Sequence, residues 1–174
     1  MMGLLLILTI VSVVIAVILT LIIIKILTNK KRKRMGAVYN LLKNDALNFA
    51  VQHPKQEKYR MDQKLIIEFI SKKINLDAVF NVEHEIVIGR GKDCNLSIKH
   101  PGISDVHCII TKRQNDILIM DRHSSNGTII KRGSKRMQLP PEGTFQLRKN
   151  DKIIISGIAI TVNMFYLDKR FLSK

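Results

Sequence analysis

Tryptophan is absent from the 174 residues, and aromatic residues make up only 5% of them. Basic residues dominate, with 29 Lys and Arg against 14 Asp and Glu and a formal net charge of +15. Proteins that bind single-stranded nucleic acid combine basic grooves with aromatic rings on which bases stack. No aromatic residue interleaves with the basic run at residues 29–34. We therefore expect no nucleic-acid partner.

Cysteine is also scarce, with only Cys94 and Cys108. Two cysteines are too few for a disulfide framework, so we expect free thiols in a reducing compartment, with a bridge between them as the alternative. The five histidines and two cysteines lack the spacing of a zinc site. Residues 89–93 (GRGKD) lack the G-x-x-x-x-G-K-[ST] spacing of a nucleotide-binding loop. We expect neither a metal nor another cofactor.

Charge is missing altogether from residues 2–24, MGLLLILTIVSVVIAVILTLIII. As a helix this run is roughly 35 Å long, enough to cross a hydrocarbon core of about 30 Å. A Lys/Arg-rich flank stays cytoplasmic, and NKKRKR follows at residues 29–34. We predict a single transmembrane helix over residues 2–28 of a cell membrane protein, with the N-terminus outside. A cleaved signal peptide would need a basic start and an A-x-A site, which the sequence lacks.

Residues 29–62 are predicted to be a basic juxtamembrane segment and a helical linker. The basic run sets the topology, and attraction to anionic lipid headgroups is a plausible addition. Apolar residues at 38, 42, 46, 49 and 50 follow helical spacing within residues 37–52, and Pro54 ends the pattern. This stripe either packs on the following domain, pairs two chains or has no partner, so the oligomeric state stays open.

Residues 63–167 change to a strand pattern, and a basic tail at residues 168–174 follows. Ten short β-branched or apolar segments are separated by turn residues such as Pro101-Gly102, Asn126-Gly127 and Arg132-Gly133. Short strands with turn signals every 8–12 residues are typical of an all-β sandwich. We expect functional residues on loops at one end, because the strands are occupied with core packing.

Three loops carry the candidate chemistry: IGRGKD (88–93), PGISDVH (101–107) and DRHSSNGT (121–128). Arg90 offers a planar fork of donors that matches phosphate oxygens. Ser104 offers a hydroxyl, and Asn126 offers a donor and an acceptor on one group. Together they could hold a phosphate monoester and orient the chain that carries it.

The turn at residues 123–128 (HSSNGT) permits three interpretations. Asn126-Gly127-Thr128 is a formal N-glycosylation acceptor, and Asn126-Gly127 is a hairpin signal. The turn could also present Ser125, Asn126 and Thr128 to a ligand. A cytoplasmic location excludes glycosylation.

In this order and spacing, Gly89-Arg90, Ser104-x-x-His107 and Asn126-Gly127 resemble the forkhead-associated (FHA) domain family over roughly residues 63–166. The resemblance implies an eleven-stranded β-sandwich that binds phosphothreonine peptides through loops at one end. Its implied roles are phosphate contacts for Arg90 and Ser104, a further phosphate or peptide contact for Ser125, a bond to the peptide backbone for Asn126, loop conformation for Gly89 and Gly127, and loop bracing for His107.

Two auxiliary residues lie beside these positions. Lys92 would add long-range attraction for the ligand. Asp105 departs from the family, which often has Arg, Ser or Asn after the serine. A carboxylate pointing inward would repel phosphate, whereas one that faces solvent or pairs with Lys99 or Arg122 would change little.

Plainer interpretations stand beside these roles. Arg90 could simply pair with Asp93 or Asp121, and Asn126-Gly127 could be only a hairpin turn. Ser104, His107 and Asp121 could suggest a hydrolase triad, but Ser104 is not in a G-x-S-x-G elbow. We expect no enzymatic activity.

The predicted function is a membrane-anchored cytoplasmic module that recruits threonine-phosphorylated proteins in signalling. The first alternative is a phosphate-independent scaffold subunit of a membrane envelope, secretion or division complex. A second is a regulatory protein that binds anionic lipids mainly through its basic run.

Overall fold

The computed structural model describes residues 2–52 and 64–166. The predicted basic tail at residues 168–174 and residues 53–63 of the predicted linker lie outside these ranges. The chain divides into two compact units, residues 1–39 and residues 40–174.

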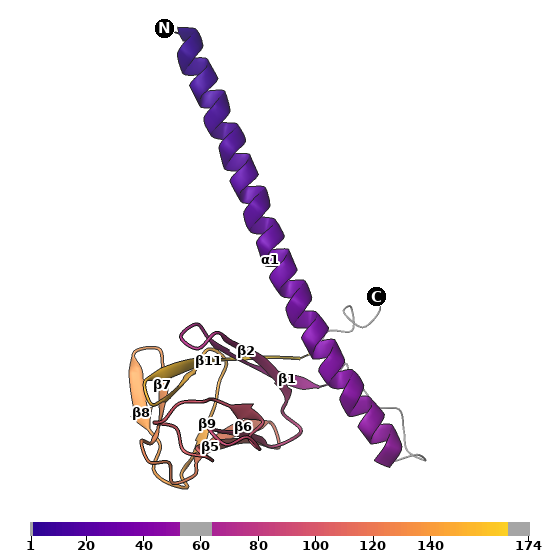
Figure 1. Cartoon of the computed structure of the whole chain (residues 1–174), viewed down its shortest axis with the longest axis vertical. Helices are drawn as coiled ribbons and strands as arrows, with labels where there is room; N and C mark the ends of the chain where they lie inside the picture. Colours follow the sequence, from indigo (N-terminus) through magenta and orange to yellow (C-terminus); the bar gives the residue numbers. More distant parts are fainter. Residues whose placement is uncertain (1, 53–63, 167–174) are drawn as a thin grey trace. The chain divides into compact units, whose positions relative to one another are not determined.

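Helix α1 runs without a break from Met2 to Gln52 (Figure 1). The sequence predicted an anchor and a linker helix separated by a basic segment, and these form one helix. Lys and Arg have high helix propensity, and Gly36, which follows the basic segment, costs only about 1 kcal/mol. The helix ends shortly before Pro54, as the sequence predicted.

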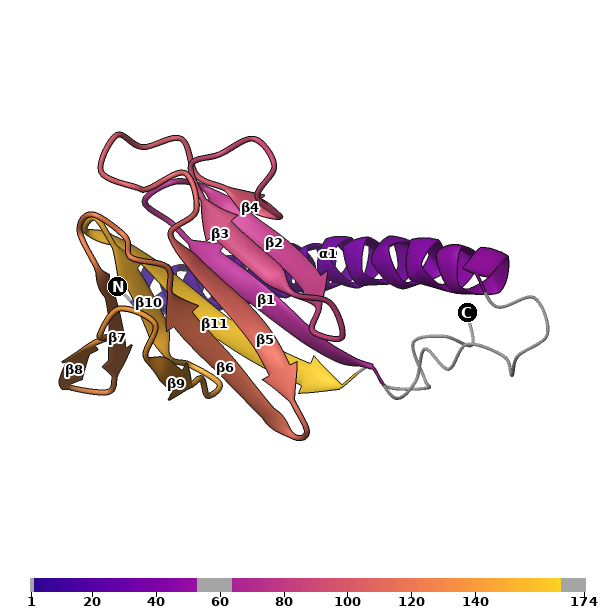
Figure 2. The same cartoon turned by 90° about the horizontal axis from the view of Figure 1, so that it is seen from below.

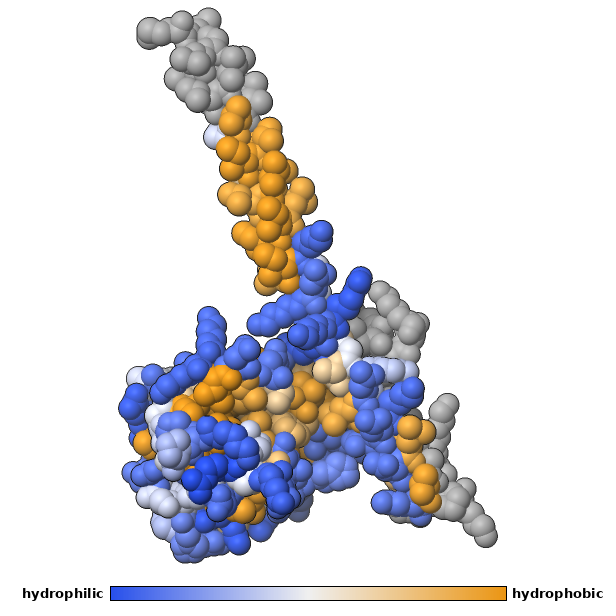
Figure 3. Space-filling model, viewed as in Figure 1, coloured by the Kyte–Doolittle hydropathy of each residue, from blue (hydrophilic) through white to orange (hydrophobic). Residues whose placement is uncertain are grey.

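The exposed surface of α1 is strongly apolar along its N-terminal half. Figure 3 shows this apolar stretch giving way to hydrophilic residues further along the helix. Residues 11–49 include a long apolar stretch that is exposed throughout. By length and composition α1 can cross a membrane.

Eleven strands follow in the described residues and form two sheets, which confirms the predicted β-sandwich (Figure 2). The six-stranded sheet has the order β2-β1-β11-β10-β7-β8, and the five-stranded sheet has the order β4-β3-β5-β6-β9. All neighbours are antiparallel except β3 and β4. The strands are β1 (Leu65–Ser71), β2 (Leu76–Asn81), β3 (Ile86–Gly89), β4 (Leu96–Ser97), β5 (Cys108–Arg113), β6 (Asp116–Asp121), β7 (Thr128–Arg132), β8 (Lys135–Gln138), β9 (Thr144–Gln146), β10 (Lys152–Ile155) and β11 (Ile158–Tyr166).

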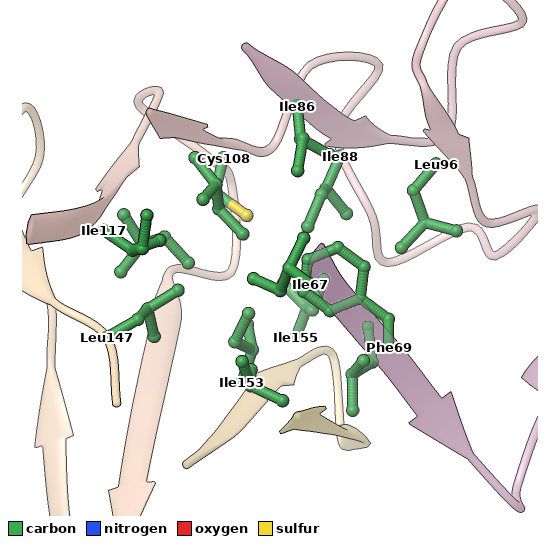
Figure 4. Close-up of a cluster of buried hydrophobic side chains, with 14 of the residues drawn as sticks. Ile67, Phe69, Ile86, Ile88, Leu96, Cys108, Ile117, Leu147, Ile153 and Ile155 are labelled. Atoms are coloured by element: carbon green, nitrogen blue, oxygen red, sulfur yellow. The ribbon is translucent and has the colours of Figure 1, made fainter. Parts of the chain in front are cut away.

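The core lies between the two sheets and is built mainly from isoleucine. Alternate residues point inward because side chains along a strand alternate between its two faces. In β10 the inward residues are Ile153 and Ile155, and both are fully buried. Figure 4 shows them close to Ile67 and Phe69 of β1 and opposite Cys108 of β5. Each fully buried side chain of this size contributes about 1.5–3 kcal/mol, so the sandwich encloses a core of its own.

Strand β8 was not among the ten segments recognised from the sequence. Its residues, KRMQ, carry two adjacent charges and no β-branched side chain. It lies at the edge of the six-stranded sheet, where charged residues discourage pairing with other chains. Met137 is its contribution to the core. A charged edge strand of this kind leaves no hydrophobic pattern in the sequence.

A charged pair joins β7 to the turn before β10. Asp151 is 1% exposed and accepts hydrogen bonds from Nε and Nη2 of Arg132 at 2.8 and 2.7 Å. It also accepts the backbone N–H of Arg148 at 2.8 Å. The Arg132 guanidinium lies over the Phe145 ring, 5.0 Å from its centroid. These contacts satisfy a carboxylate that would otherwise be costly to bury.

We predict that Asp151→Asn lowers the free energy of unfolding by roughly 1.5–3 kcal/mol, because an amide nitrogen would face N–H donors in place of an acceptor. Asp77→Asn, at an exposed position of β2, is the matched control and should stay within about 0.5 kcal/mol of the wild type. The chain lacks tryptophan, so urea unfolding is best followed by alkylation of the buried thiol of Cys108. Equal unfolding midpoints for the two variants would contradict the prediction.

Candidate functional site

Two backbone hydrogen bonds join the loop after β3 to the loop before β5. The N–H of Arg90 donates to the Ser104 carbonyl at 2.8 Å, and the N–H of Gly91 donates to the Asp105 carbonyl at 3.0 Å. A Cβ at residue 89 would overlap the Asp105 carbonyl oxygen. Glycine at this position therefore allows the two loops to meet. Figure 2 shows these loops together at one end of the sandwich.

His107 connects these loops to the loop after β6. It is fully buried, and its Nδ1 accepts the N–H of Ser104 at 3.2 Å. Its Nε2 lies 3.2 Å from the Gly127 carbonyl, to which it donates as the neutral Nε2–H tautomer. Burial lowers the pKa of this imidazole and outweighs the hydrogen bond to the Gly127 carbonyl, which raises it. The lowered pKa favours the neutral form of His107. The structure thus places His107 as a brace, bonded to the backbone of Ser104.

Asp121 shapes the turn between β6 and β7. Its carboxylate is buried and accepts the N–H of Ser124 at 2.8 Å and the hydroxyls of Ser124 and Thr128, each at 2.6 Å. Burial acts to raise the pKa of Asp121, but the hydrogen bonds from Ser124 and Thr128 outweigh it, and the pKa is lowered. Gly127 has φ +68, a left-handed conformation that glycine adopts without steric cost.

This turn presents Ser125 and Asn126 at the surface beside Ser104. The Ser104 hydroxyl oxygen accepts the N–H of Ser125 at 3.0 Å and lies 3.4 Å from the Ser125 hydroxyl. The Asn126 side chain donates from Nδ2 to the Gly102 carbonyl at 2.7 Å. A Cβ at residue 102 would overlap Ser156 Oγ and crowd Asn126 Nδ2. Gly102 therefore supports this surface, a role that its place in a Pro-Gly turn did not reveal.

Arg90 lies next to this surface, with its side chain 44% exposed. It donates from Nε at 3.2 Å and from Nη2 at 3.1 Å to the same oxygen, Oδ1, of Asp105. Arg90 therefore pairs with Asp105. It does not pair with Asp93 or Asp121, the two partners suggested from the sequence.

The partners suggested for Asp105 were also wrong. Lys99 donates from Nζ to the Arg90 carbonyl at 2.8 Å, and Arg122 pairs with Glu142 at 3.2 Å. The two cations are thus engaged elsewhere, and Asp105 pairs with Arg90 instead.

Four predicted ligand contacts therefore come together from three loops: Arg90, Ser104, Ser125 and Asn126. Lys92 is exposed on the Arg90 loop. The suggestion that Thr128 faces a ligand is wrong, because its side chain is fully buried against Asp121. The sequence could have predicted this burial. Thr128 lies two residues before the core residue Ile130, so the two side chains point to the same face of β7.

Other supporting residues were missed. Ser124 bonds Asp121, and the Ser97 hydroxyl donates to the Arg90 carbonyl at 3.2 Å. The Asp121-x-x-Ser124 spacing is typical of a side chain that accepts from the backbone of the following turn, and this signal could have identified the first of them.

Comparison with known families decides the identity of the sandwich. Residues 86–156, which hold all four candidate contacts, match the FHA domain family model. This chain contains an FHA domain. No curated protein sequence matches the chain.

Solved structures of FHA domains resemble this one. The FHA domain of an Arabidopsis thaliana hypothetical protein is 24% identical, with a TM-score of 0.52, and the match covers 66% of this chain and 94% of that one. The FHA domain of Chlamydia trachomatis CT664 is 20% identical, with a TM-score of 0.46, covering 58% and 97%. The MEK1 FHA domain in complex with a phosphothreonine peptide of HOP1 is 20% identical, with a TM-score of 0.45, covering 56% and 94%. The first of these supports the FHA fold.

We predict that Asp121→Asn destabilises the FHA domain in a pH-dependent way. Because the pKa of Asp121 is lowered by folding, its contribution is complete above the ordinary aspartate pKa of about 3.9 and is lost as the pH falls through the lower, folded value. The gap in thermal midpoint between wild type and variant should therefore be largest near neutral pH and narrow in acid.

Calorimetry between about pH 7 and pH 2 measures this gap. Asp93→Asn removes the same charge from an exposed position of a neighbouring loop and serves as the control. A gap that stays constant across this range would show that the carboxylate charge of Asp121 does not stabilise the turn.

Proposed function

We propose that this chain is a membrane-anchored cytoplasmic module that binds phosphothreonine peptides and recruits phosphorylated proteins in signalling. The observation that carries the proposal is the convergence of Arg90, Ser104, Ser125 and Asn126 at one end of the FHA domain. They come from three loops that are joined by backbone hydrogen bonds and by His107. A site held in this way is largely preorganised, which lowers the entropic cost of binding.

Each residue type suits its proposed role. The Arg90 guanidinium supplies permanently charged donors in a plane, which match two oxygens of a phosphate. Ser104 Oγ already accepts the N–H of Ser125, so its own hydrogen can be donated to a phosphate oxygen. The bond from Asn126 to the Gly102 carbonyl orients the carboxamide that would contact the peptide backbone.

Helix α1 supports the membrane part of the proposal. Its apolar N-terminal half is long enough to cross a bilayer, and residues 29–34 follow with five basic side chains. By the positive-inside rule the basic end, and the FHA domain after it, would be cytoplasmic. Anionic lipid headgroups would attract the same basic side chains.

One observation favours a second function, the phosphate-independent scaffold of an envelope, secretion or division complex. Arg90 already has a carboxylate partner in Asp105. If this pair were permanent, the FHA domain would dock partners without phosphate. A partner captured by the chain separates the two functions: phosphatase treatment should release it from a phosphothreonine reader and leave it bound to a scaffold.

We predict that Arg90→Ala weakens binding of a phosphothreonine peptide, selected from a degenerate library, by at least about tenfold. Hydrogen bonds to charged groups contribute about 1.5–3 kcal/mol each. Arg113→Ala is the matched control, because Arg113 is exposed at the far end of β5 from the site. Fluorescence polarisation measures both affinities. If Arg90→Ala bound the peptide as tightly as Arg113→Ala, the proposed clamp would be wrong.

We also predict the orientation of the chain in the membrane. A cysteine placed before Met1 should react with a membrane-impermeant maleimide in intact cells, whereas Ser134→Cys, on an exposed loop of the FHA domain, should react only after permeabilisation. The two variants control for each other. Labelling of Ser134→Cys in intact cells would place the FHA domain outside and contradict the proposal.

A further inference from the structure

The carboxylate of Asp105 occupies donors that the proposed function assigns to phosphate. One oxygen, Oδ1, accepts both Nε and Nη2 of Arg90 at 3.2 and 3.1 Å. These two groups form the edge of the guanidinium that matches paired oxygens of an anion. A phosphate that uses this edge must displace Asp105.

Displacement should be easy, because the pair is exposed. The side chain of Asp105 is 76% exposed and that of Arg90 is 44% exposed. Ion pairs between exposed groups are weak, so competition from Asp105 should cost a ligand about two- to fivefold in affinity. A phosphate monoester carries up to two negative charges and three acceptor oxygens, which allows it to win this competition.

Asp105 cannot move far once it is displaced. Its carbonyl oxygen accepts the N–H of Gly91 and the thiol of Cys94, each at 3.0 Å, and is packed against Gly89. These contacts fix the backbone, so the carboxylate stays within one side-chain length of Arg90 and of any phosphate bound there. A second negative charge at this distance from the phosphate is unfavourable.

Among the residues that the structure describes, the cation that pairs with Asp105 is Arg90, which the phosphate would take. Lys99 is bonded to the Arg90 carbonyl, and Arg122 is paired with Glu142. The cation that relieves the repulsion is then best supplied by the ligand. An extended peptide advances about 3.3–3.6 Å per residue, so a lysine or arginine within two residues of the phosphothreonine can reach Asp105.

We propose that Asp105 selects phosphothreonine peptides with Lys or Arg next to the phosphothreonine. In the free protein Arg90 and Asp105 neutralise each other. In the complex the phosphate takes Arg90 and the basic residue of the peptide takes Asp105. This inference rests on the proposed function and adds the class of ligand. The net charge of +15 acts in the opposite direction, since long-range attraction favours acidic peptides.

The test compares three phosphothreonine peptides of otherwise identical sequence. They carry Lys, Ala or Glu at the two positions on each side of the phosphothreonine. The solubilised full-length chain is titrated with each peptide, phosphorylated and unphosphorylated, by fluorescence polarisation. The variants are Asp105→Asn and, as matched control, Asp93→Asn. Both change the net charge equally, and both residues are exposed. The quantity measured is the ratio of Kd for the Glu peptide to Kd for the Lys peptide.

Asp105→Asn should tighten binding of the Ala peptide by about two- to fivefold and lower the Glu-to-Lys ratio by a similar factor. Asp93→Asn should leave the ratio close to that of the wild type. Asp105→Lys should shift preference further toward the Glu peptide.

Equal effects of Asp105→Asn and Asp93→Asn on the ratio would overturn the inference and leave the proposed function standing. If Asp105→Asn bound every peptide more tightly by the same factor, Asp105 would compete with phosphate for Arg90 without selecting among peptides. That result would also overturn the inference. Wild-type binding that does not depend on phosphorylation, or no binding at all, would overturn the proposed function and the inference with it.

Discussion

The contact between two stretches of backbone, Arg90-Gly91 and Ser104-Asp105, is the constraint on which the rest of the site depends. Its two hydrogen bonds bring a cation and a hydroxyl from different loops to one place. Such close approach requires residue 89 to have no side chain. The core beneath holds the strands that carry these loops, so the position of Arg90 follows from the packing of the sandwich.

A second layer of polar contacts turns this junction into a surface. His107 and Asp121 are both buried, and neither points a charged group to solvent. His107 is bonded to backbone on two sides, and Asp121 gathers donors from Ser124 and Thr128. Their role is to fix the turn that carries Ser125 and Asn126. The entropy cost of ordering this turn is therefore incurred when the protein folds, so the turn loses less entropy when a ligand binds.

The sequence was sufficient to predict the β-sandwich and the residues that meet at one end of it. Alternating isoleucines define the inward faces of strands such as β10, and the ordered motifs placed Arg90, Ser104 and Asn126 on loops. Strand β8 could not be recognised, because a charged edge strand has no apolar pattern. The Arg90–Asp105 pair was equally hidden, since pairing between exposed side chains depends on which loops meet in three dimensions. The continuity of α1 was missed because a basic segment between two apolar ones looks like a boundary although its residues favour helix.

The central claim is that these loops form a phosphothreonine site, and NMR chemical-shift mapping tests it most directly. The ¹⁵N-labelled chain would be titrated with a degenerate pool of phosphothreonine peptides and with the same pool unphosphorylated. We expect the backbone amides of Arg90, Ser104, Ser125 and Asn126 to shift with the phosphorylated pool alone. Equal shifts with both pools, or shifts confined to strands away from these loops, would contradict the claim.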